Sequence, residues 1–177
     1  MATSSKNKFF RTNIKRIILA GCGGTGSILA EHLCRMIAGF KLDCSLVLYD
    51  GDKVEEANIT RQNFEVYEIG QNKAQSLAIR LAGKFGIEVG FIGQFIDRYD
   101  QYIYGQYIGE LLITATDNLL SRKIAAQAGC NLWLDVGNEL SHGQAIIGTT
   151  HSQGCLRRVY TYFDDDAYVD ELPDAAA

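Results

Sequence analysis

Short apolar runs alternate with longer mixed segments along most of the chain. Six runs have the length of buried strands, and they cover residues 17–20, 46–49, 87–92, 110–115, 131–136 and 144–150. The segments between them predict helices over 25–38, 71–84 and 118–128. In the second helix, Ala74, Leu77, Ala78 and Leu81 fall on one face. Strands that alternate with helices predict a Rossmann-like α/β fold, in which a doubly wound, mainly parallel sheet carries helices on both faces.

The remaining segments add one helix and one strand. The stretch at 95–107 carries four tyrosines and predicts a partly buried amphipathic helix, and 157–163 predicts another strand. A polar lead-in at 1–13 and an acidic tail at 164–177 are expected to be flexible ends. No repeat or linker divides the sequence, and 177 residues suit a single domain over 1–177.

Composition narrows the class of protein. The chain is 47% hydrophobic and 21% charged, which is ordinary for a soluble globular domain, and its net charge of −4 argues against nucleic acid as the main partner. The five cysteines are odd in number and form no CxxC pair, so a reducing compartment is expected and a zinc site is not. No apolar run is long enough to cross a membrane, and we expect a cytoplasmic protein without a membrane partner.

A glycine-rich loop follows the first predicted strand and opens the first predicted helix. Its glycines are Gly21, Gly23, Gly24 and Gly26. Gly21 allows the tight turn, Gly23 lets backbone N–H groups approach a phosphate, and the last two allow close packing of helix on strand. Asp50 ends the second strand, where it can accept hydrogen bonds from ribose hydroxyls. This order predicts a mononucleotide-binding unit rather than a purely structural turn, and Ser27, in place of a lysine, excludes a P-loop.

Polar residues gather at the carboxyl ends of the strands, the edge at which open α/β sheets bind ligands. They are Asp50 and Asp52 after the second strand, Asn58, Arg61 and Gln62 in the next loop, Lys73 at a helix start, and Asp117 after the fourth strand. Arg61 and Lys73 are expected to stabilise charge on an attacked phosphorus, and Asp117 to hold Mg²⁺. Asp117 is also placed to cap the helix that follows it.

Four segments resemble one known family. They are GCGGTG at 21–26, YDGDKVEEANITRQNF at 49–64, IGQNKAQ at 69–75 and TATDNLLSRK at 114–123. They are similar to the GxGGxG, DxDxVxxxNxxRQ, GxxKA and TDN patterns of the ThiF/MoeB and ubiquitin-activating (E1-type) adenylation family. The resemblance spans about 17–148, and its details look most similar to the ThiF-like proteins of the bacterial PRTRC system.

The resemblance implies an ATP- and Mg²⁺-dependent adenylyltransferase. In that family the C-terminal carboxylate of a small ubiquitin-fold protein attacks the α-phosphate of ATP, giving an acyl-adenylate and pyrophosphate. The four glycines would then line the phosphates, Asp50 would bind the ribose, and Asp52 would assist Asp117 with the metal. Asn58, Arg61 and Gln62 would contact the phosphates, with Lys73 beside the α-phosphate. A homodimer is implied by the resemblance alone.

The sequence also departs from the family pattern. It lacks the two CxxC pairs that bind zinc in many relatives and the N-terminal RYxRQ segment, for which Arg11 is only a positional candidate. It stops soon after the sixth strand, and Cys155 matches no motif that would carry a thioester. Two other classes therefore stay open, a non-catalytic nucleotide-binding assembly partner and an NAD-dependent oxidoreductase. ATP–pyrophosphate exchange and an NAD titration would separate them from the adenylyltransferase.

Overall fold

The computed structural model describes residues 14–96, 109–117, 119–127, 132–138 and 143–148. Within them the chain forms one sheet with strand order β3-β2-β1-β4-β5-β6. The strands are β1 (Arg16–Ala20), β2 (Ser45–Tyr49), β3 (Val89–Ile92), β4 (Glu110–Thr114), β5 (Leu132–Asn138) and β6 (Gly143–Gly148). The helices are α1 (Gly24–Phe40), α2 (Lys73–Phe85) and α3 (Leu119–Gln127), with short 3-10 turns η2 (Glu56–Asn58) and η3 (Val66–Glu68).

The sheet is mainly parallel, as the sequence predicted. β1 lies between β2 and β4 and pairs in parallel with both, while β6 pairs antiparallel with β5. The strand order runs outward from β1 in one direction through β2 and β3, and in the other through β4 and β5. The order therefore reverses at β1, whose carboxyl end carries the glycine turn. In open α/β sheets such a reversal point opens the crevice that holds ligands.

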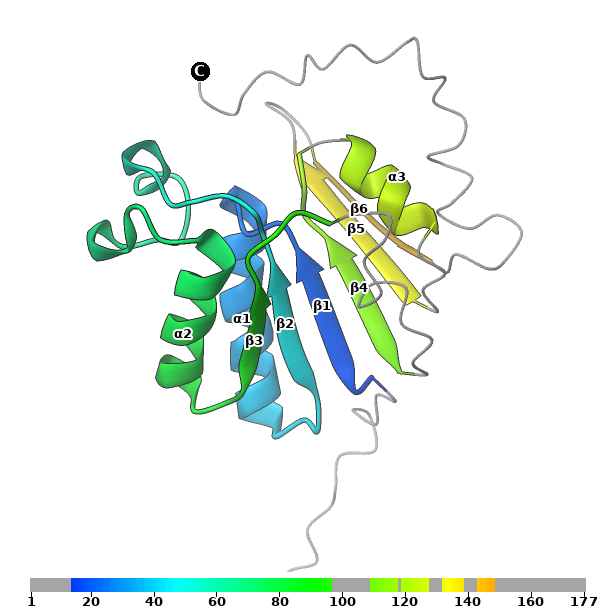
Figure 1. Ribbon diagram of the computed structural model, residues 1–177. Helices are drawn as coiled ribbons and strands as arrows, with labels where there is room; N and C mark the ends of the chain where they lie inside the picture. The colour runs from blue at the N-terminus through cyan, green and yellow to red at the C-terminus, as the bar shows by residue number, and fades with distance from the viewer. Residues whose placement is uncertain (1–13, 97–108, 118, 128–131, 139–142, 149–177) are drawn as a thin grey trace, which may run out of the picture.

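Helices cover both faces of the sheet (Figure 1). Side chains alternate along β1, because successive residues of a strand point to opposite faces. Ile17 and Leu19 pack into a core cluster with α1 and α2, whereas Ile18 and Ala20 pack into a second cluster with α3. The Rossmann-like, doubly wound arrangement predicted from the sequence is thus confirmed.

Local signals explain where the helices begin and end. Asn72 caps α2, and its side-chain oxygen accepts a hydrogen bond from the Gln75 N–H at 3.0 Å. The same helix ends at Phe85, and its C-cap Gly86 has a φ of +64°, the left-handed conformation that glycine adopts readily. The helix therefore begins two residues later than predicted.

Several expectations lie outside the described residues. They are the flexible ends, the strand over 157–163, most of the helix over 95–107, Arg11 and Cys155. None of the helices in the described part of the chain combines the length and the apolar character needed to cross a bilayer.

Candidate functional site

The glycine turn between β1 and α1 is shaped by two close backbone approaches. Gly21 has a φ of +92°, and a Cβ there would lie 2.6 Å from the Ala115 carbonyl oxygen. A Cβ on Gly26 would lie 1.8 Å from the Gly21 oxygen. Gly23 is different, because a Cβ there would meet no described atom within 4 Å. Gly21 and Gly26 therefore serve the turn itself, while Gly23 borders open space at the start of α1.

The start of α1 is suited to an anion. Gly23 is the N-cap and has no side chain to occupy the free N–H groups of the first turn, which also contains no acidic residue. Free N–H groups and the helix dipole together favour negative charge at such a position.

Asp50 joins the glycine turn to the loop after β2. Its carboxylate oxygens accept hydrogen bonds from the Cys22 N–H at 2.6 Å and from the Asp52 N–H at 2.8 Å. Burial raises the pKa of the Asp50 carboxyl above its usual range, while these two N–H groups and the Lys73 charge act in the opposite direction. Asp50 thus organises two loops, in addition to the ribose contact expected of it.

Lys73 and Asp52 form an ion pair beside this carboxylate. The Lys73 Nζ lies 3.3 Å from the Asp52 Oδ2, and the Lys73 N–H donates to the Asp52 carbonyl at 2.9 Å. The lysine side chain is 9% exposed and the aspartate side chain 54%. A cation at a helix start needs an anion nearby, and in the described structure Asp52 supplies it.

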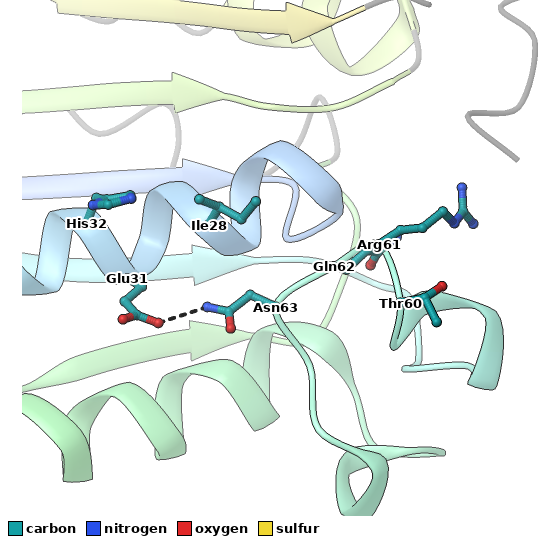
Figure 2. A pocket seen from close by; sticks show the side chains of 7 residues that line it. All are labelled: Ile28, Glu31, His32, Thr60, Arg61, Gln62 and Asn63. Carbon is teal, nitrogen blue, oxygen red and sulfur yellow. Dashed lines mark hydrogen bonds between the residues drawn. The ribbon is translucent and has the colours of Figure 1, made fainter.

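The loop after β2 brings Arg61 to the glycine turn. A Cβ on Gly24 would lie 3.8 Å from the Arg61 carbonyl oxygen. The exposed Arg61 side chain extends past the start of α1 and away from Glu31, as Figure 2 shows. Asn58 is buried, and its Oδ1 accepts a hydrogen bond from the Glu55 N–H at 3.0 Å, which shapes the same loop.

Asn63 fastens this loop to α1 and α2. Its N–H donates to the Ser27 hydroxyl at 3.0 Å, and its side-chain amide donates to Glu31 at 3.1 Å (Figure 2). Its carbonyl accepts a hydrogen bond from Arg80, which also pairs with the buried Glu68 at 3.0 Å. We call Ser27, Glu31, Asn63 and Arg80 the Asn63 lock. The sequence did not predict these contacts, and it used Ser27 only to exclude a P-loop.

The lock borders an open groove of about 440 Å³ between α1 and the loop. Its lining residues are Ile28, Glu31, His32, Thr60, Arg61, Gln62 and Asn63. The Gln62 Oε1 is buried without a hydrogen-bond partner among the described residues. Lys84, Asn63 and Arg35 lower the pKa of Glu31 to about 2, with the hydrogen bond from Lys84 the largest cause.

Asp117 lies at the same edge of the sheet, after β4. It is exposed, and the backbone N of Thr116 before it would lie 3.1 Å from a Cβ on Gly21. The Thr116 hydroxyl is buried and has no hydrogen-bond partner within the described residues. The description of α3 begins at Leu119 and residue 118 lies outside the described residues, so the helix cap expected of Asp117 stays a prediction. The backbone thus gathers Arg61, Lys73 and Asp117 around the glycine turn.

This arrangement fits a nucleotide phosphate and a magnesium ion. The described residues contain no cluster of three or more His, Cys, Asp or Glu side chains that could hold a metal by themselves. Magnesium needs no such cage, because it is usually bound by one or two carboxylates together with substrate phosphates and water. Asp52 and Asp117 are exposed carboxylates of this kind, and the open space at Gly23 leaves room for phosphate oxygens.

The fold and the glycine turn define a Rossmann-like α/β protein. The chain belongs to the ThiF family, whose profile matches residues 6–174. It is 30% identical over 146 residues to ubiquitin-like modifier-activating enzyme 5 of Caenorhabditis elegans, covering 74% of this chain and 33% of that protein. It is 38% identical over 92 residues to the ATP-dependent ubiquitin transferase-like protein Cap2 of Escherichia coli strain TW11681, covering 49% of this chain and 15% of Cap2.

Solved structures share the fold. MccB of E. coli superposes with a TM-score of 0.65 at 20% identity, over 82% of this chain and 44% of MccB. The E. coli tRNA N6-threonylcarbamoyladenosine dehydratase TcdA, solved in complex with AMP, gives a TM-score of 0.56 at 26% identity, over 66% of this chain and 46% of TcdA. This chain spans about a third of the length of the ubiquitin-like modifier-activating enzymes that it matches.

Proposed function

We propose that this protein uses Mg²⁺ and ATP to activate the C-terminal carboxylate of a small ubiquitin-fold protein as an acyl-adenylate. The observation that supports the proposal is the backbone geometry at the glycine turn: the Arg61 carbonyl approaches Gly24, the segment before Asp117 packs against Gly21, and the Lys73–Asp52 pair lies beside Asp50. Arg61 and Lys73 would supply two cations, and Asp52 and Asp117 two carboxylates. A dehydrogenase binds a pyrophosphate mainly through backbone and helix dipole and has little use for this set.

The triphosphate would lie against the start of α1, with Gly21, Gly23, Gly24 and Gly26 lining it. Asp50 would accept hydrogen bonds from the ribose, using the lone pairs that Cys22 and Asp52 leave. The side chains of Asn58 and Gln62 would contact the phosphates. The buried Thr116 hydroxyl supports this placement, because it has no hydrogen-bond partner among the described residues and can donate to a phosphate oxygen.

Asp117 and Asp52 would hold the magnesium ion, which neutralises phosphate charge when bound. Lys73 lies beside Asp52 and would bind the α-phosphate, and Arg61, from the loop that the Lys73–Asp52 pair closes, would contact the phosphates. The incoming carboxylate is already ionised at neutral pH, so the protein needs no general base. Its oxygen attacks the α-phosphorus, and the bond from that phosphorus to the pyrophosphate oxygen breaks. Positioning and charge stabilisation would carry the rate.

The relatives support this proposal by what they bind. ThiF-family proteins named as ubiquitin-like modifier-activating enzymes match most of this chain. MccB has been solved with AMPCPP and MccA, and TcdA with AMP and with ATP. A homodimer and a cytoplasmic location belong to the same proposal.

The test is ATP–pyrophosphate exchange with a ubiquitin-fold protein whose C-terminal carboxylate is free. The same protein with an amidated C-terminus serves as the control, because an amide cannot attack as a carboxylate. Exchange that requires Mg²⁺ and disappears in Asp117→Ala is the expected result. Tight ATP binding without exchange would instead favour a nucleotide-binding assembly partner, and tight NAD binding without Mg²⁺ would favour a redox enzyme.

A further inference from the structure

A set of polar side chains runs through the apolar core beneath α3. Thr114 on β4 and Asp135 on β5 are neighbours in the register of the sheet, and both are fully buried. The Thr114 hydroxyl donates a hydrogen bond to the Asp135 carboxylate and accepts one from the Trp133 indole at 2.9 Å. The orientation of the Asp135 carboxylate is therefore fixed from within the core.

Arg122 reaches this carboxylate from α3, which lies over β4 and β5 (Figure 1). Its Nη1 lies 3.4 Å from the Asp135 Oδ2, and its side chain is 13% exposed. The guanidinium fits because Gly137 has no side chain: a Cβ there would lie 2.4 Å from the Arg122 Nη2. The Arg122 guanidinium therefore occupies the space that a side chain at position 137 would need.

The Arg122 guanidinium also contacts the backbone turn that precedes Asp117. The Arg122 Nη2 and Nε donate hydrogen bonds to the Thr116 carbonyl at 2.9 Å and 3.3 Å. On its opposite side the same turn packs against Gly21. The backbone before Asp117 is therefore fixed between the glycine turn and the guanidinium of Arg122.

Stability alone does not account for this arrangement. A buried ion pair returns little net free energy, because the two charges lose their hydration. The planar guanidinium can, however, bind a carbonyl with two N–H groups and a carboxylate with a third, which a lysine cannot do. We propose that Arg122 and Asp135 are positioning residues that fix the Asp117 turn and, with it, the point at which the active site holds its divalent cation. This inference rests on the proposed function.

Two variants test the inference, and one serves as a control. Arg122→Lys keeps the positive charge but loses the planar set of N–H donors that the guanidinium offers. Gly137→Ala keeps the arginine, but its new methyl group crowds the Arg122 Nη2. Arg35→Lys, at an exposed arginine on α1, is the control. In nucleotide-free protein, amide hydrogen exchange at 115–117 should be about tenfold faster in both variants than in the control, with exchange in β1 unchanged. In the presence of ATP, the Mg²⁺ concentration at half-saturation should rise about tenfold, with ATP affinity in EDTA unchanged.

Each outcome decides one point. Unchanged exchange at 115–117 in folded Arg122→Lys protein would overturn the positioning role, and Gly137→Ala carries this test if the lysine variant does not fold. Faster exchange with an unchanged Mg²⁺ requirement would overturn the link to the cation. Wild-type protein that binds ATP without any Mg²⁺ dependence would contradict the proposed function instead, and the exchange data would still decide whether Arg122 holds the turn.

Discussion

The Lys73 ammonium lies 3.3 Å from the Asp52 carboxylate, and the pair closes the loop that carries Arg61. Asn72 strengthens the closure, because its side-chain amide donates to the carbonyls of Asp50 at 2.8 Å and Asp52 at 3.1 Å. A magnesium-bound triphosphate would separate the pair, because Lys73 would then bind the phosphate and Asp52 would bind the cation. The same contact therefore keeps the lysine in place before the nucleotide arrives.

Lys73→Met should remove most of the exchange activity and leave the fold intact. A charge that acts mainly in the transition state typically contributes about 10²- to 10³-fold in rate. Breaking the pair leaves only the exposed Asp52 behind, so the free energy of unfolding should change by at most about 1 kcal/mol. ATP–pyrophosphate exchange and urea unfolding measure the two quantities. Lys53→Met, at an exposed lysine of the same loop, is the control, and equal losses in both variants would contradict the role of Lys73.

Gly26→Ala and Gly23→Ala should separate structure from binding. A Cβ on Gly26 would lie 1.8 Å from a backbone oxygen, so the clash outweighs the helix propensity of alanine, about 1 kcal/mol, and should cost about 3 kcal/mol of stability. Gly23→Ala places its methyl group in open space, so its free energy of unfolding should lie within about 0.5 kcal/mol of the wild-type value. Its ATP affinity should nevertheless fall, because the methyl group occupies the phosphate space. Wild-type affinity in Gly23→Ala would place the nucleotide elsewhere.

Asn63→Ala should weaken ATP binding through Arg61. The substitution removes the amide hydrogen bonds to Glu31 and to the Ser27 carbonyl, each worth about 1 kcal/mol, and frees the loop that presents the arginine. Titration calorimetry of Asn63→Ala, Arg61→Ala and the double variant measures the coupling. If the lock acts through Arg61, the double variant should lose little more affinity than Arg61→Ala alone. Additive losses would show that Asn63 affects ATP binding independently of Arg61, and unchanged affinity in Asn63→Ala would show that the lock serves stability only.

Glu31 should make folding sensitive to acid. Its pKa is lowered from 4.5 to about 2 in the folded protein, so its carboxylate contributes stability above pH 4.5 that is lost as the pH falls towards 2. Glu31→Gln should remove this contribution, so its urea midpoint should fall less than that of wild type between about pH 5 and pH 2.5. Glu88→Gln, at an exposed glutamate, is the control. Equal acid sensitivity in all three proteins would contradict the prediction.

The sequence predicted the sheet because its strands are short apolar runs bounded by glycine or polar residues, and the helices between them dictate parallel pairing. It also placed Arg61, Lys73 and Asp117 at one edge, since the carboxyl ends of parallel strands coincide. The antiparallel pairing of β6 with β5 could not be predicted in this way, because an apolar run does not show whether its strand pairs parallel or antiparallel.

Side-chain partners were the part that the sequence did not give. Ser27 and Asn63 are 36 residues apart, and their contact depends on how the loop after β2 folds back onto α1. The sequence does carry one sign of such a partner, because Asp135 interrupts the apolar strand that contains Trp133. A carboxylate in such a strand is buried, and a buried carboxylate needs a cation or several hydrogen bonds. That requirement points to Arg122, although only the structure shows that the same arginine holds the Asp117 turn.

Titration calorimetry of nucleotide-free wild-type protein with ATP and with NAD, each with and without Mg²⁺, tests the central claim most directly. The gathering of Arg61, Lys73 and Asp117 at the glycine turn predicts one ATP site that tightens when Mg²⁺ is added, and much weaker binding of NAD. NAD binding that is tighter than ATP binding and indifferent to Mg²⁺ would contradict the account.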